Sequence, residues 1–338
     1  MRYVSMGNSI TAGYQSGGIH GLLQADAYPV LLAEKAGATF GIPALTYPGC
    51  PPPLAAPLSA ERIAVIECAY RTFDAPPLVQ NVAVPGHTIG DALVVDGPGS
   101  NFLATLILGG RTQVEAMRAA EPTLVSVWLG NNDALAAALS ADTAALTPMP
   151  AFATALEQIV VAIEETAGDA IFIGVADPMM IAPALQPGAY FWLVEQSGEA
   201  PVPLAVEDDC APGTAGGARW VSFLVANDYI AGDADSVRVS CAADAPYVLN
   251  EGETAAVVAR VAAFNEAIRD VAEARGWAYV DPTTSFIGPA LADPDLVRKC
   301  QGLATATTEA ELRAAVEDTC PAPLAPNFFG AYFSFDGI

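Results

Sequence analysis

A serine near the start of the chain is placed where it could act as a nucleophile. Ser9 lies within Gly7-Asn8-Ser9-Ile10-Thr11-Ala12-Gly13, directly after a short apolar run at residues 3–6. This order predicts a strand that turns into a helix at the serine, with the hydroxyl at the carboxyl end of a parallel strand and beside the N–H groups of a helix N-terminus. The alternative is that Ser9 only caps the helix, since serine is a favoured N-cap residue.

Two later segments offer hydrogen-bond donors of the kind that acyl transfer needs. A serine that attacks a carbonyl requires donors directed at the developing oxyanion and a base that is itself oriented. Gly86 ends the run 81–86, and its backbone N–H can approach a substrate closely because no side chain blocks it. Gly130-Asn131-Asn132-Asp133 follows the run 124–129 and presents amide NH₂ groups. Each segment alone is also an ordinary turn sequence.

The elements that must position these residues follow from an alternation of two patterns. Short apolar runs at 3–6, 82–84, 124–129, 171–175 and 278–280 predict strands. Helical periodicity covers 28–36, 112–120, 152–167 and 253–275, the last followed by Gly276 as a C-cap. Strand then helix, repeated, predicts a doubly wound parallel sheet with helices on both faces. The expected fold is α/β, a three-layer α/β/α sandwich whose strand ends form one functional rim.

Three stretches do not follow this alternation. They cover about 41–77, 186–250 and 287–326 and are rich in Pro, Gly, Ala or acidic residues. We interpret them as insertions into a single domain that spans 1–338. Aromatic residues of the middle insertion could line a substrate cleft, but a small satellite core is the favoured interpretation. These residues are Tyr190, Phe191, Trp192, Trp220, Phe223 and Tyr229.

Six cysteines fall in three sequential pairs, one in each insertion. We expect local disulfides Cys50–Cys68, Cys210–Cys241 and Cys300–Cys320, which would place the protein in an oxidising, extracytoplasmic compartment, whether periplasmic, cell-surface or secreted. Buried, unpaired cysteines of a cytosolic protein are the alternative. No CxxC pair occurs, so neither a zinc ribbon nor a thioredoxin-type site is indicated.

Charge and hydropathy exclude several partners. The chain has 14 Lys and Arg against 38 Asp and Glu, a formal net charge of −24, which would repel nucleic-acid phosphates and anionic lipid headgroups. No run of 18 or more apolar residues is present, so no membrane span is expected. The expected first strand begins so close to Met1 that no secretory signal fits ahead of it, and we expect the native start to lie elsewhere.

Four blocks in order resemble the SGNH (GDSL) hydrolase family. That family has a Gly-Asp-Ser near its start, a glycine after the second strand, a Gly-x-Asn-Asp after the third and an Asp-x-x-His near its end. The matching residues here are Gly7-Asn8-Ser9, Gly86, Gly130-Asn131-Asn132-Asp133 and Asp336-Gly337-Ile338. The resemblance spans the chain apart from the insertions. It implies the SGNH fold with a flavodoxin-like sheet and a serine esterase or lipase that uses no metal or organic cofactor.

The resemblance also implies roles for individual residues. Ser9 would attack the ester carbonyl, while the backbone N–H groups of Ser9 and Gly86 and the side chain of Asn132 would hold the oxyanion. Asp336 would orient the base. The expected substrate is a small ester or a lipid, with acyl groups of moderate length favoured by the apolar insertions. Acyl transfer instead of hydrolysis, the alcohol of the substrate and the oligomeric state are left open by the sequence.

The chain departs from the family pattern at two positions. Asn8 replaces the usual aspartate before the serine, a change that the backbone turn should tolerate. The sequence ends at Ile338, one residue before the histidine of the last block, and neither His20 nor His87 is at that position. We therefore expect a fragment cut just before its general base and nearly inert, since losing one member of such a triad costs on the order of 10⁴ to 10⁶ in turnover.

The other function classes that we considered have weaker support. A binding or scaffold module that kept the fold and lost catalysis is the main alternative, and the missing histidine is its support. No GxGxxG or GxxxxGK[ST] motif lies near Gly7, no GxSxG nucleophile elbow occurs, and two separated histidines cannot supply an HExxH metal site. The sequence therefore favours a serine-dependent carboxylic ester hydrolase.

Overall fold

The structure of the chain is a computed structural model. It describes residues 1–55, 61–65, 68, 70–74, 76–95, 97, 101–181, 184–198, 200 and 202–287. Three of our expectations lie outside these residues: the role of Asp336, the third cysteine pair Cys300–Cys320, and almost all of the insertion at 287–326.

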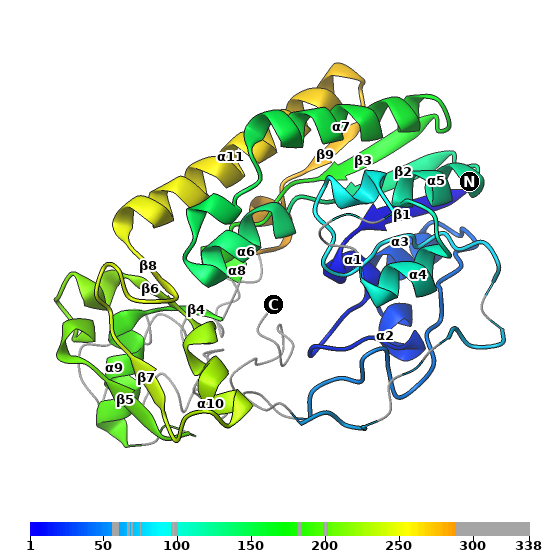
Figure 1. Cartoon of the computed structure of the whole chain (residues 1–338). Helices are drawn as coiled ribbons and strands as arrows, with labels where there is room; N and C mark the ends of the chain where they lie inside the picture. The colour runs from blue at the N-terminus through cyan, green and yellow to red at the C-terminus, as the bar shows by residue number, and fades with distance from the viewer. Residues whose placement is uncertain are drawn as a thin grey trace.

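A parallel sheet of four strands forms the centre of the main body (Figure 1). In spatial order the strands are β1 (Tyr3–Gly7), β2 (Leu124–Trp128), β3 (Asp169–Ile173) and β9 (Ala278–Val280). All three pairings are parallel, and in the first Ser5 lies opposite Ser126. Every residue of β1 is buried, as expected for a strand covered on both faces. The expected α/β fold with a parallel sheet is confirmed at this level.

The fifth expected strand, at 82–84, is an extended segment at the edge of β1. It is not part of a named strand, yet Val82 N donates to Ser5 O at 2.9 Å and Val84 N donates to Gly7 O at 3.1 Å. Ser5 N in turn donates to Gln80 O at 2.8 Å. These bonds hold 80–84 beside β1, so that the end of this segment, with Gly86, lies near the end of the first strand.

The four expected helices are present, and their ends shift by no more than three residues. They are α3 (Tyr28–Lys35), α5 (Gln113–Ala119), α7 (Met149–Glu164) and α11 (Glu251–Ala274). Helix α5 begins with a capping box between Thr112 and Glu115. Figure 1 shows α7 and α11 side by side on one face of the sheet and α3 on the other. On the α3 face, Tyr28 contacts the ring of Trp128 edge to face.

Further short helices lie between these elements. Those in the main body are α1 (Ser9–Ala12), α2 (Gly21–Ala25), α4 (Phe102–Leu108), α6 (Asn132–Ser140) and α8 (Pro178–Ile181). Single turns of 3-10 helix cover Asp91–Leu93 and Thr143–Ala145, and a π-helical turn covers Thr283–Ile287. The sequence analysis did not predict α4 or α6, and α6 carries one of the candidate site residues.

One helical stretch in the described part of the chain, Thr143–Glu164, is long and apolar enough to cross a membrane. This is weak support for a span, because the core helix of a water-soluble domain passes the same test. Phe152, Ile159 and Ile163 of α7 are fully buried in the main core, and the Phe152 ring stacks on Phe264 of α11. The helix therefore contributes its apolar face to the main core.

The middle insertion folds as a lobe with its own core, at the left of Figure 1. A small antiparallel sheet has the order β4 (Leu185–Pro187), β6 (Trp220–Ser222) and β8 (Val248–Leu249). A parallel pair joins β5 (Leu204–Val206) to β7 (Val237–Val239), and α9 (Gly188–Ser197) and α10 (Asn227–Ala231) pack around them. Short 3-10 turns cover Asp208–Cys210, Gly216–Ala218 and Phe223–Ala226.

The aromatic residues of this lobe pack mainly into its own core, as the favoured interpretation predicted. Tyr190 and Phe191 are buried there, and Trp192, Phe223 and Tyr229 are half-buried and pack against the same core. Trp220 is the exception, because it packs against the main core. The predicted satellite core is confirmed for five of the six aromatic residues.

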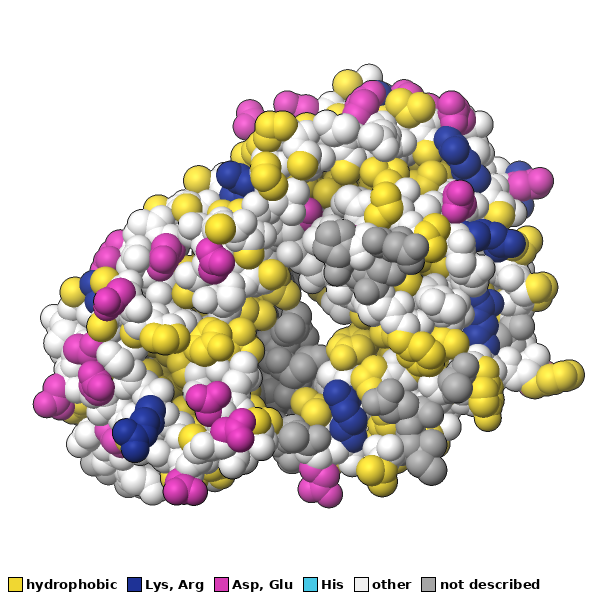
Figure 2. Space-filling model, in the orientation of Figure 1, with side chains coloured by type: hydrophobic (Ala, Val, Ile, Leu, Met, Phe, Trp, Pro, Cys, Tyr) yellow, Lys and Arg dark blue, Asp and Glu magenta, His cyan; other side chains and the backbone are white. Residues whose placement is uncertain are grey.

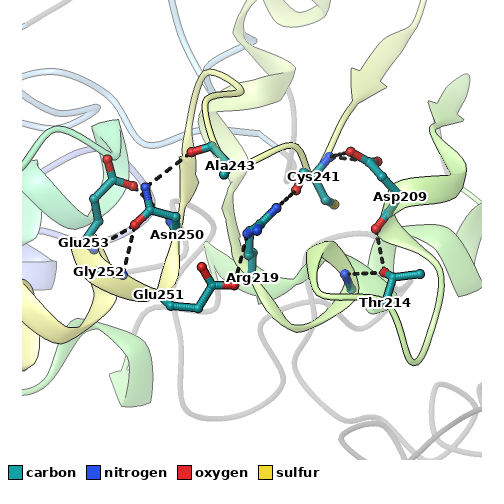
Figure 3. Close-up of polar contacts among 10 residues, drawn as sticks. Asp209, Thr214, Arg219, Cys241, Ala243, Asn250, Glu251, Gly252 and Glu253 are labelled. Atoms are coloured by element: carbon teal, nitrogen blue, oxygen red, sulfur yellow. Dashed lines mark hydrogen bonds and ion pairs between the residues drawn. The ribbon is translucent and has the colours of Figure 1, made fainter.

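Polar contacts join this lobe to the start of α11 (Figure 3). Arg219 donates to Cys241 O at 2.7 Å and forms an ion pair with Glu251, in the first turn of α11, at 3.3 Å. Asn250 caps the same helix by accepting from the N–H groups of Gly252 and Glu253. The base of the lobe is thereby fixed to the longest helix of the main body.

Two of the three expected disulfides are present. Cys50 bonds to Cys68 in the first insertion, and Cys210 bonds to Cys241 in the middle one. The described part of the chain contains no free cysteine. Asp209 lies beside the second disulfide, and its carboxylate accepts a hydrogen bond from Cys241 N. This contact holds the backbone at Cys241. Two disulfides are compatible with the expected extracytoplasmic location.

Candidate functional site

The turn after β1 places Ser9 at the very start of a helix. Ser9 is the first residue of α1, and the N-cap is Asn8, whose side chain makes no capping bond. The alternative role of Ser9 as the N-cap is therefore wrong. Among the described residues the Ser9 hydroxyl has no hydrogen-bond partner. A Cβ on Gly7 would lie 2.1 Å from Oγ1 of Thr11, so the close approach of strand and helix requires glycine.

Gly86 follows the extended segment that pairs with β1. Its φ of 86° lies in the left-handed region that glycine adopts without strain. The side chain of Asn101 donates to Pro85 O at 2.8 Å and also caps α4 by accepting from Leu103 N. The backbone N–H of Gly86 has no partner among the described residues, so it is available to a ligand.

Asn132 is the first residue of α6, and its neighbour Asn131 is the N-cap. The Asn132 amide donates to His87 O at 2.9 Å, which leaves its second hydrogen for another acceptor. Asn131 instead accepts from Ala176 N at 3.0 Å and so fixes the segment that follows β3. The two adjacent asparagines therefore differ in where they lie: Asn131 is buried, whereas Asn132 lines the pocket described next.

One pocket of about 510 Å³ brings the three predicted residues together. Ser9, Gly86 and Asn132 all line it, although they come from segments far apart in the chain. The remaining lining is largely apolar: Ile10, Tyr14, Cys50, Pro51, Pro85, Phe102, Leu103 and Leu135, with Arg62 and Asn101. No described residue of the 185–249 lobe is among those that line this pocket. Asp336, the fourth predicted residue, lies outside the described residues.

A buried glutamine connects the segments around this pocket. Gln113, in the first turn of α5, accepts from Gly7 N at 3.0 Å and donates to Gly7 O at 3.0 Å. Its amide nitrogen also lies 3.1 Å from Nδ1 of His87. Because His87 O accepts from Asn132, the bonds run from the end of β1 through the Gly86 loop to α6. The sequence analysis missed Gln113, whose only signal was a polar residue in the first turn of a predicted helix.

His87 is held in a neutral form by its surroundings. The two bonds to Gly7 fix the orientation of the Gln113 amide, so its nitrogen donates and Nδ1 of His87 accepts. Burial lowers the pKa of His87, and the nearby Asp91 opposes this effect. His87 is not among the residues that line the pocket. The ring is therefore placed to support the Gly86 loop.

His20 also has a structural environment. It precedes α2 and contacts the ring of Tyr47 edge to face, with 5.4 Å between the ring centroids. Burial lowers the pKa of His20. Within the described part of the chain, no hydrogen bond joins either histidine to Ser9. Neither histidine is therefore arranged as the base for this serine.

Asp133 fastens the loop that follows Gly86. Its Oδ2 accepts from Ile89 N at 2.9 Å, while Oδ1 is buried without a partner among the described residues. Burial raises the pKa of Asp133 to about 6, and the nearby Asp91 adds to the shift. The sequence analysis quoted this residue within its motif but gave it no role of its own.

Comparison with known proteins adds no further information on the site. No protein-family model matches this chain, and no curated protein matches it. The functional assignment therefore depends on the arrangement of Ser9, Gly86 and Asn132 around one pocket and on the resemblance of their sequence blocks.

Proposed function

We propose that this protein is a serine-dependent carboxylic ester hydrolase of the SGNH (GDSL) type. The observation that carries the proposal is the shared pocket: a serine hydroxyl without a hydrogen-bond partner among the described residues, a glycine N–H and an asparagine amide line one cavity. They come from the ends of β1, the 80–84 segment and β2. Ligands of open α/β folds bind at this edge of the sheet.

In the proposed reaction, Oγ of Ser9 attacks the ester carbonyl carbon and loses its proton to a general base. The carbonyl oxygen becomes an oxyanion that accepts from the N–H groups of Ser9 and Gly86 and from the Asn132 amide. Collapse of this intermediate breaks the bond to the alcohol, which leaves with the proton. Water then cleaves the acyl-enzyme and regenerates the serine.

The family resemblance implies that the general base is oriented by Asp336. Neither His87 nor His20 has the surroundings of such a base. His87 Nδ1 is occupied by Gln113, and His20 packs on Tyr47, so neither ring is arranged to accept the Ser9 proton. The proposed chemistry assigns no role to a metal or an organic cofactor.

The lining of the pocket supports an acyl group of moderate length as the substrate. Ile10, Phe102, Leu103 and Leu135 present apolar side chains beside Ser9. Apolar contacts of this kind contribute about 0.8 kcal/mol for each CH₂ group removed from water. A short or medium acyl chain could therefore bind along this wall with its carbonyl carbon at Ser9.

A binding or scaffold module on the same fold is the second candidate. The observation that favours it is the lack of any hydrogen bond between Ser9 and a histidine within the described residues. Such a module would bind esters or acyl groups in the pocket without turnover. The two candidates differ in one measurable property, the formation of a covalent bond to Ser9.

The test compares p-nitrophenyl esters from acetate to palmitate and labelling by an alkyl fluorophosphonate. We expect hydrolysis of the short and medium esters and covalent labelling of the protein. Ser9→Ala should abolish both. Ser140→Ala is the matched control, because this half-buried serine on α6 only donates to Ala136 O. Hydrolysis or labelling that survives Ser9→Ala would contradict the nucleophile, and absence of both from the unchanged protein would favour the binding module.

A further inference from the structure

We propose that Arg62 forms an anion-binding subsite in the same pocket, so that the preferred ester carries a carboxylate or phosphate group. This inference rests on the proposed function, because it names the chemical class of the substrate. Among the described residues that line the pocket, Arg62 is the only charged one. A cation in this pocket would bind an anionic substituent of the substrate. A neutral ester would lack that contact and would bind more weakly.

Arg62 is fixed in place by neutral acceptors. Its Nη1 donates to Gly17 O at 2.7 Å and to Pro52 O, which ties the first insertion to the turn after α1. Residue 62 also pairs with Leu54 in an isolated antiparallel bridge. Because both hydrogen-bond acceptors are carbonyl oxygens, they orient the guanidinium without neutralising its charge.

No carboxylate of the described residues compensates the charge of Arg62. Arg118, Arg219 and Arg275 each form an ion pair with a glutamate, whereas Arg62 has none among the described residues. Its Nε and Nη2 make no hydrogen bond there either. A guanidinium carries five N–H donors in a planar fork, so donors remain for a ligand. This fork matches the two oxygens of a carboxylate or phosphate.

The overall charge of the chain does not prevent this binding. The net charge is −24, and acidic side chains are spread over the face seen in Figure 2. Long-range repulsion by such charges is screened beyond about 8 Å at physiological ionic strength. A direct contact with a partly buried guanidinium is screened much less. The local contact therefore decides selectivity, and added salt should reduce the long-range repulsion first.

The binding test uses the Ser9→Ala protein, so that no turnover is required. Isothermal titration would compare hexyl phosphate with dimethyl hexyl phosphate, an uncharged triester of the same alkyl chain. Loss of a charged hydrogen bond corresponds to about tenfold in affinity. We expect Arg62→Gln to weaken the binding of hexyl phosphate by about this factor and to change the affinity for the triester by less than about twofold. Arg62→Lys, which keeps the charge, should restore part of the difference.

Arg238→Gln is the matched control, because it removes the same charge from the exposed face of β7 in the lobe. It should leave both affinities unchanged. The proposal is wrong if Arg62→Gln weakens the two ligands equally, since the residue would then only shape the pocket. It is also wrong if Arg238→Gln reproduces the effect, since net charge would then be the cause.

A kinetic test distinguishes the position of the anion and separates this inference from the proposed function. One comparison measures kcat/KM for monomethyl adipate and dimethyl adipate, a pair in which the charge lies on the acyl side. The other measures kcat/KM for hexanoylglycerol phosphate and hexanoylglycerol, a pair in which the charge lies on the alcohol side. Arg62→Gln should lower kcat/KM for the anionic member of one pair by about tenfold. Hydrolysis that survives Ser9→Ala would overturn the proposed function alone. Serine-dependent hydrolysis with no change in either pair would overturn the subsite alone.

Discussion

The amide nitrogen of Gln113 lies 3.1 Å from Nδ1 of His87, and both side chains are buried beneath the rim that carries Ser9 and Gly86. The same amide exchanges two hydrogen bonds with the backbone of Gly7. One side chain thus fixes the end of the nucleophile strand relative to the loop that supplies the glycine N–H. Buried polar groups joined in this way give a site a defined geometry, provided that each one has its partner.

Gln113→Leu should therefore reduce both stability and catalysis. The substitution leaves the N–H of Gly7 and Nδ1 of His87 without these partners, while Gly7 O keeps its bond from Val84 N; each unsatisfied buried group costs about 1–3 kcal/mol. Urea unfolding should show a loss of several kcal/mol, with kcat lowered more than KM is raised. Gln158→Leu, an exposed position on α7, is the control and should change stability by less than about 0.5 kcal/mol. An unchanged unfolding midpoint for Gln113→Leu would contradict this role.

Substitution of the adjacent asparagines should separate catalysis from stability. Asn132→Ala removes a proposed oxyanion donor and should lower kcat by about 10² to 10³ with little change in KM. Asn131→Ala removes the acceptor for Ala176 N and should cost about 1–3 kcal/mol of unfolding free energy. Steady-state kinetics and urea unfolding of both variants check the distinction. The opposite pattern, with Asn131 controlling kcat, would exchange the assigned roles.

The stability of the protein should depend on pH through Asp133. Its pKa is raised from 3.8 to about 6 by burial, so the folded state binds the proton more tightly than the unfolded state does. The stability that this proton contributes is complete below pH 3.8 and is lost as pH rises through about 6. A difference of this size in pKa corresponds to about 3 kcal/mol.

Asp133→Asn isolates that effect, because the amide oxygen can still accept from Ile89 N. The advantage of the variant over the wild type should grow by up to about 3 kcal/mol between pH 4 and pH 7.5. His87 and His20 act in the opposite direction. Their pKa values are lowered, so their contribution is lost as pH falls below the ordinary value of 6.5. If the unfolding free energies of variant and wild type changed equally between pH 4 and pH 7.5, Asp133 would not be the titrating group.

The two disulfides should differ in their effect on the pocket. Cys50 lines the pocket, whereas Cys210 and Cys241 lie in the core of the lobe. Replacing Cys50 and Cys68 by alanine removes a cross-link between residues 18 positions apart. The free energy of unfolding should fall by about 3 kcal/mol, and hexyl phosphate should bind more weakly. Replacing Cys210 and Cys241 removes a cross-link between residues 31 positions apart. The free energy of unfolding should fall by about 4 kcal/mol, while binding of hexyl phosphate should be unchanged. Thermal unfolding and titration of both proteins check this; equal loss of binding would show that the first disulfide has no special role.

The sequence predicted the core of the fold because its strands and long helices have strong patterns. The buried run of β1 and the amphipathic face of α11 are of this kind. The 82–84 segment was expected as a regular strand but pairs with β1 only at the edge of the sheet. Helix α6 was missed because it begins within Asn131-Asn132-Asp133, a sequence that is typical of a turn.

The candidate site was predictable only in part. Ser9, Gly86 and Asn132 each follow an apolar run, and parallel strands bring such positions to one edge. Arg62 and Gln113 could not be found in this way. Arg62 reaches the pocket because it lies in an insertion that a disulfide stabilises. Gln113 acts by hydrogen bonds to the backbone of Gly7, which lies more than 100 residues earlier in the chain. Contacts of this kind depend on tertiary packing that a local pattern does not record.

The chain enters and leaves the 185–249 lobe through the two outer strands of one small sheet, because β4 and β8 both pair with the central strand β6. Leu185 and Leu249 belong to the main core, and Trp220 packs against it. This sheet is therefore common to the lobe and the main body. An engineer who exchanged the lobe would have to keep these three apolar contacts for the scaffold that bears Ser9 to stay packed.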